Sequence, residues 1–303
     1  MENTTLRHSG AFDWTSALAF LSRRTIPGVE RVVDGTYQRT IRVGPAIGTL
    51  AASYDSRSNL LIVTAPAALA DDAIARLRRM FDLDADLQAV NAHLSLDPYM
   101  ARLVAARPAL RVPGGWDPFE VALRSIIGQQ VSVDRARQLN GVLVERCGST
   151  LPNGAGQALC RLFPTAQQVV DADLSTMGMP GARVTALKTV AAAAVDDPRL
   201  FERGATLDDT IARLRRLRGI GDWTAHYIAM RACREPDAFP ASDVGLLRGA
   251  ADADGRRPTP AALLERAEAW RPWRAYAAHH LWAVDSTASD GVRHPREGAR
   301  LRA

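Results

Sequence analysis

The sequence predicts an α+β domain of antiparallel strands and helices, followed by an all-α region. Alternating runs rich in β-branched residues occur only in the first part of the chain, where turn-forming residues separate them. After about residue 90 this alternation does not return, and prolines and glycines separate stretches of helical periodicity. A Gly219-Ile220-Gly221 turn joins two of these helical stretches. The 303 residues are enough for roughly two domains.

Composition and charge narrow the class of protein. Hydrophobic residues make up 47% of the chain and charged residues 23%, as in a globular protein with a substantial core. No apolar run approaches the length of a membrane span, and the N-terminus lacks the apolar core of a signal peptide, so we expect a cytoplasmic protein. The net charge of +5 is compatible with nucleic-acid binding without proving it. Three widely spaced cysteines predict reduced thiols.

The α+β domain is predicted to contain a helix, several strands and a second helix. The first helix runs from about residue 13 to 24, with Trp14, Leu18 and Leu21 on one face. The second covers about residues 67–81. The strands between them are predicted at Val29–Val33, Tyr37–Val43, Ile47–Tyr54 and Leu60–Thr64.

Two features of the helical region predict contacts with another molecule. A helix from Phe119 to Ile127 ends at Gly128, and Ser132 can cap the next helix, so residues 129–131 form an exposed polar loop. Further on, the Gly219-Ile220-Gly221 turn joins two helices, with Asp208 and Asp209 in the first turn of the earlier one. Glycines allow close approach, and the free N–H groups of the turn and of the next helix's N-terminus are expected to point outward as donors, which favours a phosphate. An ordinary helix connection is the alternative.

The chain carries a series of motifs in a fixed order: Asp13-Trp14 through Phe20-Leu21, Phe81-Asp82-Leu83, Trp116-Asp-Pro-Phe119, Ile127-Gly-Gln-Gln-Val-Ser-Val133, Met177-Gly-Met179, Leu217-Arg-Gly-Ile-Gly-Asp-Trp223-Thr-Ala-His-Tyr227, Phe239-Pro-Ala-Ser-Asp243 and Arg271-Pro-Trp-Arg-Ala-Tyr276. This order resembles the helix-hairpin-helix DNA glycosylases, and more narrowly the bacterial 3-methyladenine DNA glycosylase II family, the AlkA type. The resemblance covers the chain from about Phe12 to Asp285.

The resemblance implies how the chain is divided and where its chemistry lies. The all-α part would be a helix-hairpin-helix glycosylase region of two helical lobes, with the chemistry in the cleft between them. The expected division is a tail at residues 1–12, the α+β domain at 13–90, the helical region at 91–285 and a disordered tail at 286–303. Within the helical region one lobe would cover about 116–235, and the other about 92–112 together with 236–285.

Asp243 is the catalytic residue that the resemblance implies. From the sequence alone, an aspartate before a helical run is a good N-cap, and both roles can hold together. Hydrolysis of an N-glycosidic bond builds positive charge on the sugar, which a carboxylate stabilises while it helps to deprotonate water. Alkylated purines such as 3-methyladenine and 7-methylguanine are cationic, so the base leaves without a second carboxylate acting as acid.

Four aromatic residues match the family's base pocket: Trp223, Tyr227, Trp282 and Phe20. Aromatic faces stack on bases and attract a cationic base more strongly. For any single ring, core packing is the alternative. Superfamily members that also cut the backbone have a lysine where this chain has Trp223, and tryptophan cannot form a Schiff base. The resemblance therefore implies a monofunctional enzyme that leaves an abasic site.

The resemblance also implies DNA contacts at Gly219, Ile220, Gly221, Thr224, Gln129 and Gln130. In the family the loop that contains Gln130 enters the duplex, often with an apolar wedge, so a polar plug is expected here. Asp222 departs from a phosphate site because its charge would repel phosphate. No cofactor is implied except a structural Na⁺ or K⁺ at the hairpin, bound by backbone carbonyls of Arg215, Leu217 and Ile220. No residue spacing suggests a transition-metal site.

The expected function is base-excision repair of alkylated double-stranded DNA by a monomeric glycosylase that flips the damaged nucleotide. Two alternatives remain open from the sequence. One is a bifunctional glycosylase/lyase for oxidised purines. The other is a non-catalytic protein that binds damaged or kinked DNA on the same scaffold.

Overall fold

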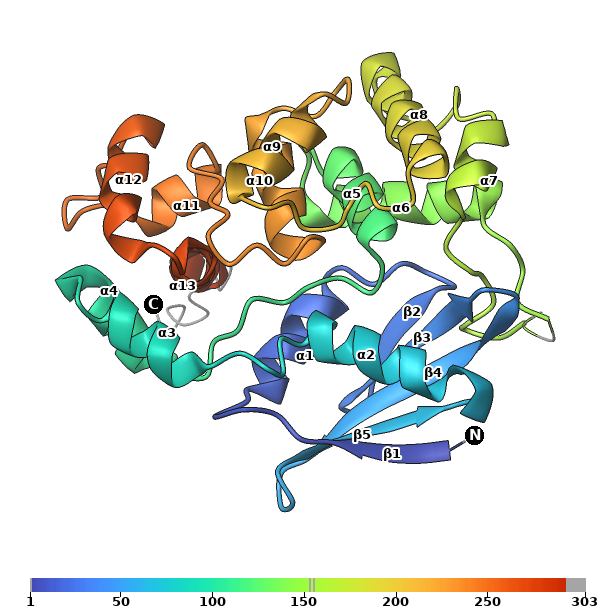
Figure 1. The fold of residues 1–303 in the computed structure, drawn as a ribbon, viewed down its shortest axis with the longest axis horizontal. Coiled ribbons are helices and arrows are strands. Elements are labelled where there is room, and N and C mark those ends of the chain that lie inside the picture. The colour runs from blue at the N-terminus through green and yellow to red at the C-terminus, as the bar shows by residue number, and fades with distance from the viewer. Residues whose placement is uncertain (1, 153, 155, 293–303) are drawn as a thin grey trace, which may run out of the picture.

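The computed structural model describes residues 2–152, 154 and 156–292, and it consists of an α+β domain joined to a helical region (Figure 1). Five strands form one antiparallel sheet in the order β1-β5-β4-β3-β2. Their bounds are β1 Glu2–Leu6, β2 Glu30–Val33, β3 Thr36–Val43, β4 Ala46–Asp55 and β5 Leu60–Ala65. Helices α1 (Trp14–Ser22) and α2 (Ala70–Met80) belong to this domain, and a 3₁₀ turn, Ala67–Leu69, precedes α2.

The four predicted strands are confirmed as β2 to β5, and both predicted helices form as α1 and α2. The expectation of a tail at residues 1–12 is wrong for residues 2–6, which form β1 and pair with β5 at the sheet edge. Only Leu6 of this strand is buried. The main-chain hydrogen bonds of an edge strand require no alternating apolar pattern, so the polar sequence Glu-Asn-Thr-Thr did not reveal it.

After the α+β domain, the secondary structure of the described residues is mainly helical, as predicted. The helices are α3 Leu87–Leu94, α4 Pro98–Ala106, α5 Pro118–Ile127, α6 Val133–Cys147, α7 Ala166–Asp171, α8 Gly181–Asp196, α9 Leu207–Arg215, α10 Asp222–Arg231, α11 Val244–Gly249, α12 Pro260–Ala267 and α13 Arg274–Val292. Figure 1 shows α5 to α10 grouped together, while α3 and α4 lie with α11, α12 and α13. This grouping follows the two lobes that the resemblance implies, although their buried residues form one continuous hydrophobic cluster.

Helix α13 extends beyond the expected start of the C-terminal tail. It is helical to Val292, so the expectation of disorder from residue 286 is wrong for residues 286–292. Adding residues to an existing helix costs far less than nucleating one, which lets a polar segment continue it. Residues 293–303 lie outside the described residues. No helix in the described part of the chain is both long and apolar enough to cross a membrane.

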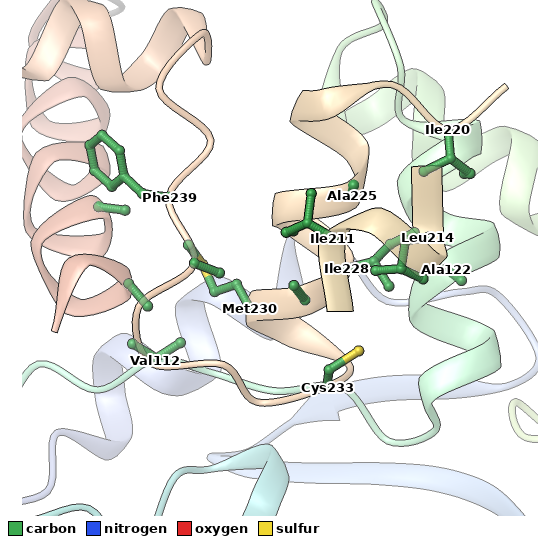
Figure 2. Packing of buried hydrophobic residues seen from close by; sticks show 14 of the residues in the cluster. Val112, Ala122, Ile211, Leu214, Ile220, Ala225, Ile228, Met230, Cys233 and Phe239 are labelled. Atoms are coloured by element: carbon green, nitrogen blue, oxygen red, sulfur yellow. The ribbon is translucent and has the colours of Figure 1, made fainter. Parts of the chain in front are cut away.

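Helices α9 and α10 form the predicted helical hairpin. The pair packs against the rest of its lobe through Ile211 and Leu214 on α9, Ile220 in the turn, and Ala225 and Ile228 on α10, all buried (Figure 2). Thr206 caps α9 through a capping box with Asp209. The hairpin is therefore anchored by its apolar face, which leaves Gly219, Gly221 and Asp222 exposed.

Candidate functional site

Asp243 lies at the junction between a loop and α11, and it is the N-cap of that helix. Its Oδ1 accepts a hydrogen bond of 3.0 Å from the Leu246 N–H. The capping role expected from the sequence is confirmed. A helix N-terminus carries partial positive charge, so a carboxylate is well placed as its cap.

Two indole N–H groups hold the same carboxylate. Trp223 of α10 donates from Nε1 to Oδ2 of Asp243 at 2.8 Å, and Trp282 of α13 donates from Nε1 to Oδ1 at 2.8 Å. Gly245 makes room for this arrangement, because a Cβ there would lie 2.9 Å from Cδ1 of Trp282. Three elements, α10, α11 and α13, thus converge on one carboxylate whose orientation is fixed by three donors.

The aromatic residues expected for the base pocket are brought together around this carboxylate. The rings of Trp223 and Tyr227 are stacked, with centroids 5.3 Å apart and planes at 17°. Tyr227 and Trp282 meet edge to face at 6.3 Å. Contacting carbon atoms stand about 3.5–4.0 Å apart, so a base between Trp223 and Tyr227 would need about twice that separation. A base must therefore use the outer faces of these rings unless the rings part.

Phe20 reaches this group from α1 of the other domain. Its ring lies 6.5 Å from that of His279, which in turn lies 5.0 Å from Trp282. Phe20 also packs against the core of the α+β domain. Phe20 is half-buried. Core packing and a position beside the site were the two alternatives from the sequence, and Phe20 has both.

Three polar residues beside these rings were not predicted from the sequence. The Cζ atoms of Arg24 and Arg231 lie 3.9 and 4.7 Å from the centroid of Phe20. His279 is buried, and burial together with Arg231, Arg234 and Arg24 lowers its pKa well below the usual value, so the ring is neutral. Arg231 follows Trp223 and Tyr227 at four-residue steps on α10, a spacing that places all three on one helix face. That spacing was the signal available in the sequence.

The hairpin turn departs in part from the expected row of outward N–H donors. Gly219 has a φ of +91°, and Gly221 precedes α10 as its N-cap. The expectation is wrong for Ile220, whose N–H donates to the Leu217 carbonyl at 3.0 Å and whose side chain is buried. Asp222 does not cap the helix. It lies exposed, 3.7 Å from Arg215, which offsets its charge.

The Gln129–Gln130 loop touches the hairpin. Gln129 donates from Nε2 to Oγ1 of buried Thr224 at 2.9 Å and to the Gly219 carbonyl at 3.1 Å. The expectation of a wholly exposed loop is wrong for Gln129, because these bonds tie it to α10. Gln130 is exposed and has a φ of +56°, a backbone conformation that residues other than glycine adopt only rarely. Ser132 caps α6 as predicted.

The residues expected to hold a monovalent cation offer only backbone carbonyls. The Leu217 oxygen already accepts the Ile220 N–H, but a carbonyl oxygen has two lone pairs and can still coordinate an ion.

Among the residues that the structure describes, no group of three or more His, Cys, Asp or Glu side chains could hold a metal. Cys147, Cys160 and Cys233 are free thiols. His226 accepts a hydrogen bond from the Phe239 N–H through Nδ1.

A cavity of about 760 Å³ lies away from Asp243, between the sheet, α5 and the segments around Phe163 and Phe201. Its arginines are largely neutralised, because Arg39 pairs with Glu120 and Arg76 pairs with Asp117. None of the aromatic residues around Asp243 lines it. The chemistry that the resemblance implies therefore does not belong to this cavity.

Comparisons with known proteins match both parts of the chain to known families. Residues 3–117 match the family described as AlkA N-terminal domain, and residues 123–275 match the HhH-GPD superfamily base excision DNA repair protein. The chain is 35% identical to DNA-3-methyladenine glycosylase 2 of Escherichia coli (strain K12) over 294 residues, which cover 94% of this chain and 99% of that protein.

A second relative is longer than this chain. The probable bifunctional transcriptional activator/DNA repair enzyme AlkA of Mycobacterium tuberculosis is 37% identical over 281 residues, which cover 90% of this chain and 55% of that protein. The chain thus spans about half the length of that relative. Among solved structures, the 3-methyladenine DNA-glycosylase from Archaeoglobus fulgidus has the same fold, with a TM-score of 0.79 at 20% identity over 94% of this chain and 99% of that one.

Proposed function

Since the chain belongs to the HhH-GPD superfamily of base excision DNA repair proteins and carries an AlkA N-terminal domain, we propose that it is a monofunctional DNA glycosylase for alkylated purines. The observation that carries the proposal is the Asp243 carboxylate, held by the indoles of Trp223 and Trp282. A fixed carboxylate surrounded by aromatic rings suits a reaction in which a stacked base leaves and the sugar becomes cationic.

The proposed reaction breaks the bond between C1′ of the sugar and the base. The electron pair of that bond goes to the base, and the sugar passes through an oxocarbenium-like state. The carboxylate of Asp243 stabilises the positive charge and helps to deprotonate the attacking water. Because its donors are already in place, little reorganisation is needed as the charge develops.

The aromatic residues support the proposed substrate class. Electron-rich faces of Trp223, Tyr227 and Trp282 attract a cationic base by about 0.5–2 kcal/mol each. An N3- or N7-methylated purine carries such a charge. Trp223 stands where bifunctional relatives are expected to have lysine, which favours a product with an intact backbone and an abasic site.

DNA is the partner that the superfamily implies, and the hairpin is the proposed contact with its backbone. The first N–H groups of a helix have no partner within it, and α10 begins at exposed Gly221 and Asp222, where a phosphate can accept such donors. Gln130, exposed on its own loop, is proposed to occupy the space left by the flipped nucleotide. We further propose that the protein acts as a cytoplasmic monomer, with a Na⁺ or K⁺ ion at the hairpin carbonyls.

Asp243→Asn tests the proposal. The amide keeps the shape of the side chain and removes its charge, so release of methylated bases should fall by at least about a thousandfold. Duplex DNA treated with dimethyl sulfate is incubated with the protein, and released bases are identified by mass spectrometry. Binding of the same duplex is measured in parallel and should persist.

The same assay separates the two alternatives. A non-catalytic DNA-binding protein would release no base from the wild-type reaction. A glycosylase/lyase would cleave the strand and become trapped on DNA by borohydride. Either result, or turnover by Asp243→Asn at the wild-type rate, would contradict the proposal.

A further inference from the structure

A buried cation stands at one end of the aromatic group. Arg231 is the last residue of α10, two turns after Trp223, and it is 7% exposed. Its Nη1 donates to the Tyr227 hydroxyl at 2.9 Å, and its Nη2 donates to the Gly114 carbonyl at 3.1 Å. Its Nε is buried without a hydrogen-bond partner among the described residues. A buried guanidinium with an unused donor is costly, so a structural role alone accounts poorly for it.

A second guanidinium reaches the same place from the turn that follows α1, which ends at Ser22. Arg24 lies over the ring of Phe20, the ring that Arg231 also approaches, and its Nη1 donates to the Phe20 carbonyl at 3.1 Å. Burial and the nearby arginines lower the pKa of Arg24 to about 10, which leaves it charged at neutral pH. The neutral state of His279 has the same origin, since burial and these arginines oppose a further positive charge.

The carboxylate of Asp243 lies at the other end of the face of α10 that carries Arg231. Trp223 holds Asp243 at the start of α10, while Arg231 ends the helix eight residues later, about 12 Å along its axis. Tyr227 lies between them and touches both, by stacking on Trp223 and through its hydroxyl on Arg231. The aromatic group therefore has a carboxylate at one end and two guanidinium groups at the other.

We propose that Arg231 and Arg24 act as an electrostatic counterpart of Asp243, which favours movement of positive charge from the base to the sugar. The inference rests on the proposed glycosylase function. When the bond between C1′ and the base breaks, its electron pair moves to the base, so a cationic base becomes neutral and a neutral base becomes an anion. In both cases the guanidinium groups interact more favourably with the base after the electron pair has arrived. Water then adds to C1′, and its proton leaves to Asp243 or to solvent.

The proposal predicts different effects on Kd for cationic and for neutral bases. A guanidinium repels a cationic base in the ground state and less so in the transition state, so it raises both the Kd and the rate of the chemical step. For a neutral base such as hypoxanthine it raises the rate and leaves the Kd unchanged. A residue that only supports the fold would affect both substrates alike.

The test uses full-length protein and two duplexes, one with a single 7-methylguanine and one with a single hypoxanthine. Single-turnover rates at saturating enzyme and Kd values are measured for wild type, Arg231→Met and Arg24→Met. For 7-methylguanine we expect each variant to lose about tenfold in rate while its Kd falls several-fold. For hypoxanthine we expect a similar loss of rate at constant Kd. Arg231→Lys keeps the charge and should restore the wild-type pattern.

Controls separate this proposal from the proposed glycosylase function on which it rests. Arg102→Met removes another arginine that lies over an aromatic ring, Tyr99, on α4, and should change neither quantity. If Arg231→Met does not fold, Arg24→Met decides, because it removes a cation from the same ring. Equal losses on both substrates without a tighter Kd for 7-methylguanine, or no loss at all, would overturn this inference alone. If the wild type releases only 7-methylguanine, a lower rate together with a lower Kd on that duplex supports the inference, and a lower rate at an unchanged or higher Kd overturns it. Failure of wild type to release either base would overturn the proposed function as well.

Discussion

Trp223 and Trp282 each combine two properties at the residue scale, an aromatic face and an indole N–H. The faces belong to the expected base pocket, while both N–H groups bind Asp243. A hydrogen bond to a charged group contributes about 1.5–3 kcal/mol, so each indole has a measurable effect on the carboxylate. The sequence motif indicated Trp223, Tyr227, Trp282 and Asp243 as one site. It did not indicate the hydrogen bonds, because residues twenty or more positions apart meet only in the folded chain.

Trp282→Phe isolates the N–H from the ring. Phenylalanine keeps an aromatic face and removes the 2.8 Å bond to Oδ1 of Asp243, so the rate of base release should fall about tenfold while DNA binding changes little. Single-turnover kinetics with a 7-methylguanine duplex measure the effect. Trp14→Phe is the matched control, since it removes an indole bond to the Gly35 carbonyl in the α+β domain. A rate equal to that of wild type would show that this bond does not matter for the reaction.

At the scale of single elements, the hairpin turn contains two glycines with different requirements. Gly219 has a positive φ, and a Cβ there would lie 2.3 Å from the Cβ of Ala186 on α8. Gly221 has an extended conformation, and a Cβ there would meet nothing within 4 Å. The sequence motif treats both glycines alike. In the structure, close packing against α8 requires glycine at position 219, whereas the space beside Gly221 is open to the approach of another backbone.

We therefore expect Gly219→Ala and Gly221→Ala to separate stability from DNA binding. Gly219→Ala should lower the free energy of unfolding by about 2–4 kcal/mol, because it combines backbone strain with a clash. Gly221→Ala should change stability by no more than about 0.5 kcal/mol yet weaken binding to duplex DNA. Urea unfolding and fluorescence anisotropy measure the two effects. Equal stability of the two variants would contradict the assignment for Gly219.

Local pattern predicted most elements but not the first strand or the end of α13. The strands β2 and β5 alternate in burial, β3 and β4 do so over part of their length, and turn residues separate all four, so each could be recognised by itself. β1 depends on its partner β5, and its side chains are mostly exposed. The caps at Ser132 and Asp243 follow from local hydrogen bonding and were predicted for that reason.

At the scale of the whole molecule, a buried ionic cluster joins the α+β domain to the helical region. Arg39 of β3 binds Glu120 of α5 at 2.8 Å, and Arg124 of α5 pairs with both Glu30 of β2 and Glu120. Arg39, Glu30 and Glu120 are each at most 5% exposed. The cluster could not be predicted from the sequence, because its members lie on separate elements and each has the sequence context of an ordinary surface charge. Helix α5 ends just before the Gln129–Gln130 loop, so the cluster also holds that loop in relation to the sheet.

The charge of Glu120 should make the stability of the whole chain depend on pH. Burial opposes its ionisation, but Arg39 and Arg124 prevail and hold its pKa below the ordinary value of 4.5. A carboxyl group whose pKa is lowered on folding adds stability above its unfolded pKa and loses it as the pH falls through its folded pKa. The contribution of Glu120 is therefore complete near pH 7 and declines below about pH 4.5.

Glu120→Gln removes that contribution and leaves Glu30 as the one carboxylate that Arg39 and Arg124 share within this cluster. We expect a loss of about 3–5 kcal/mol in the free energy of unfolding at pH 7, measured by urea titration. The difference from wild type should shrink as the pH is lowered from 5 toward 3, because Glu120 is then increasingly protonated in the unfolded chain and must lose that proton to keep its ion pairs on folding. Glu202→Gln is the matched control, since its pair with Arg199 is exposed and should contribute less than about 1 kcal/mol at any pH. A difference between wild type and Glu120→Gln that stays constant over this range would mean that packing, and not charge, holds the two parts of the molecule together at α5.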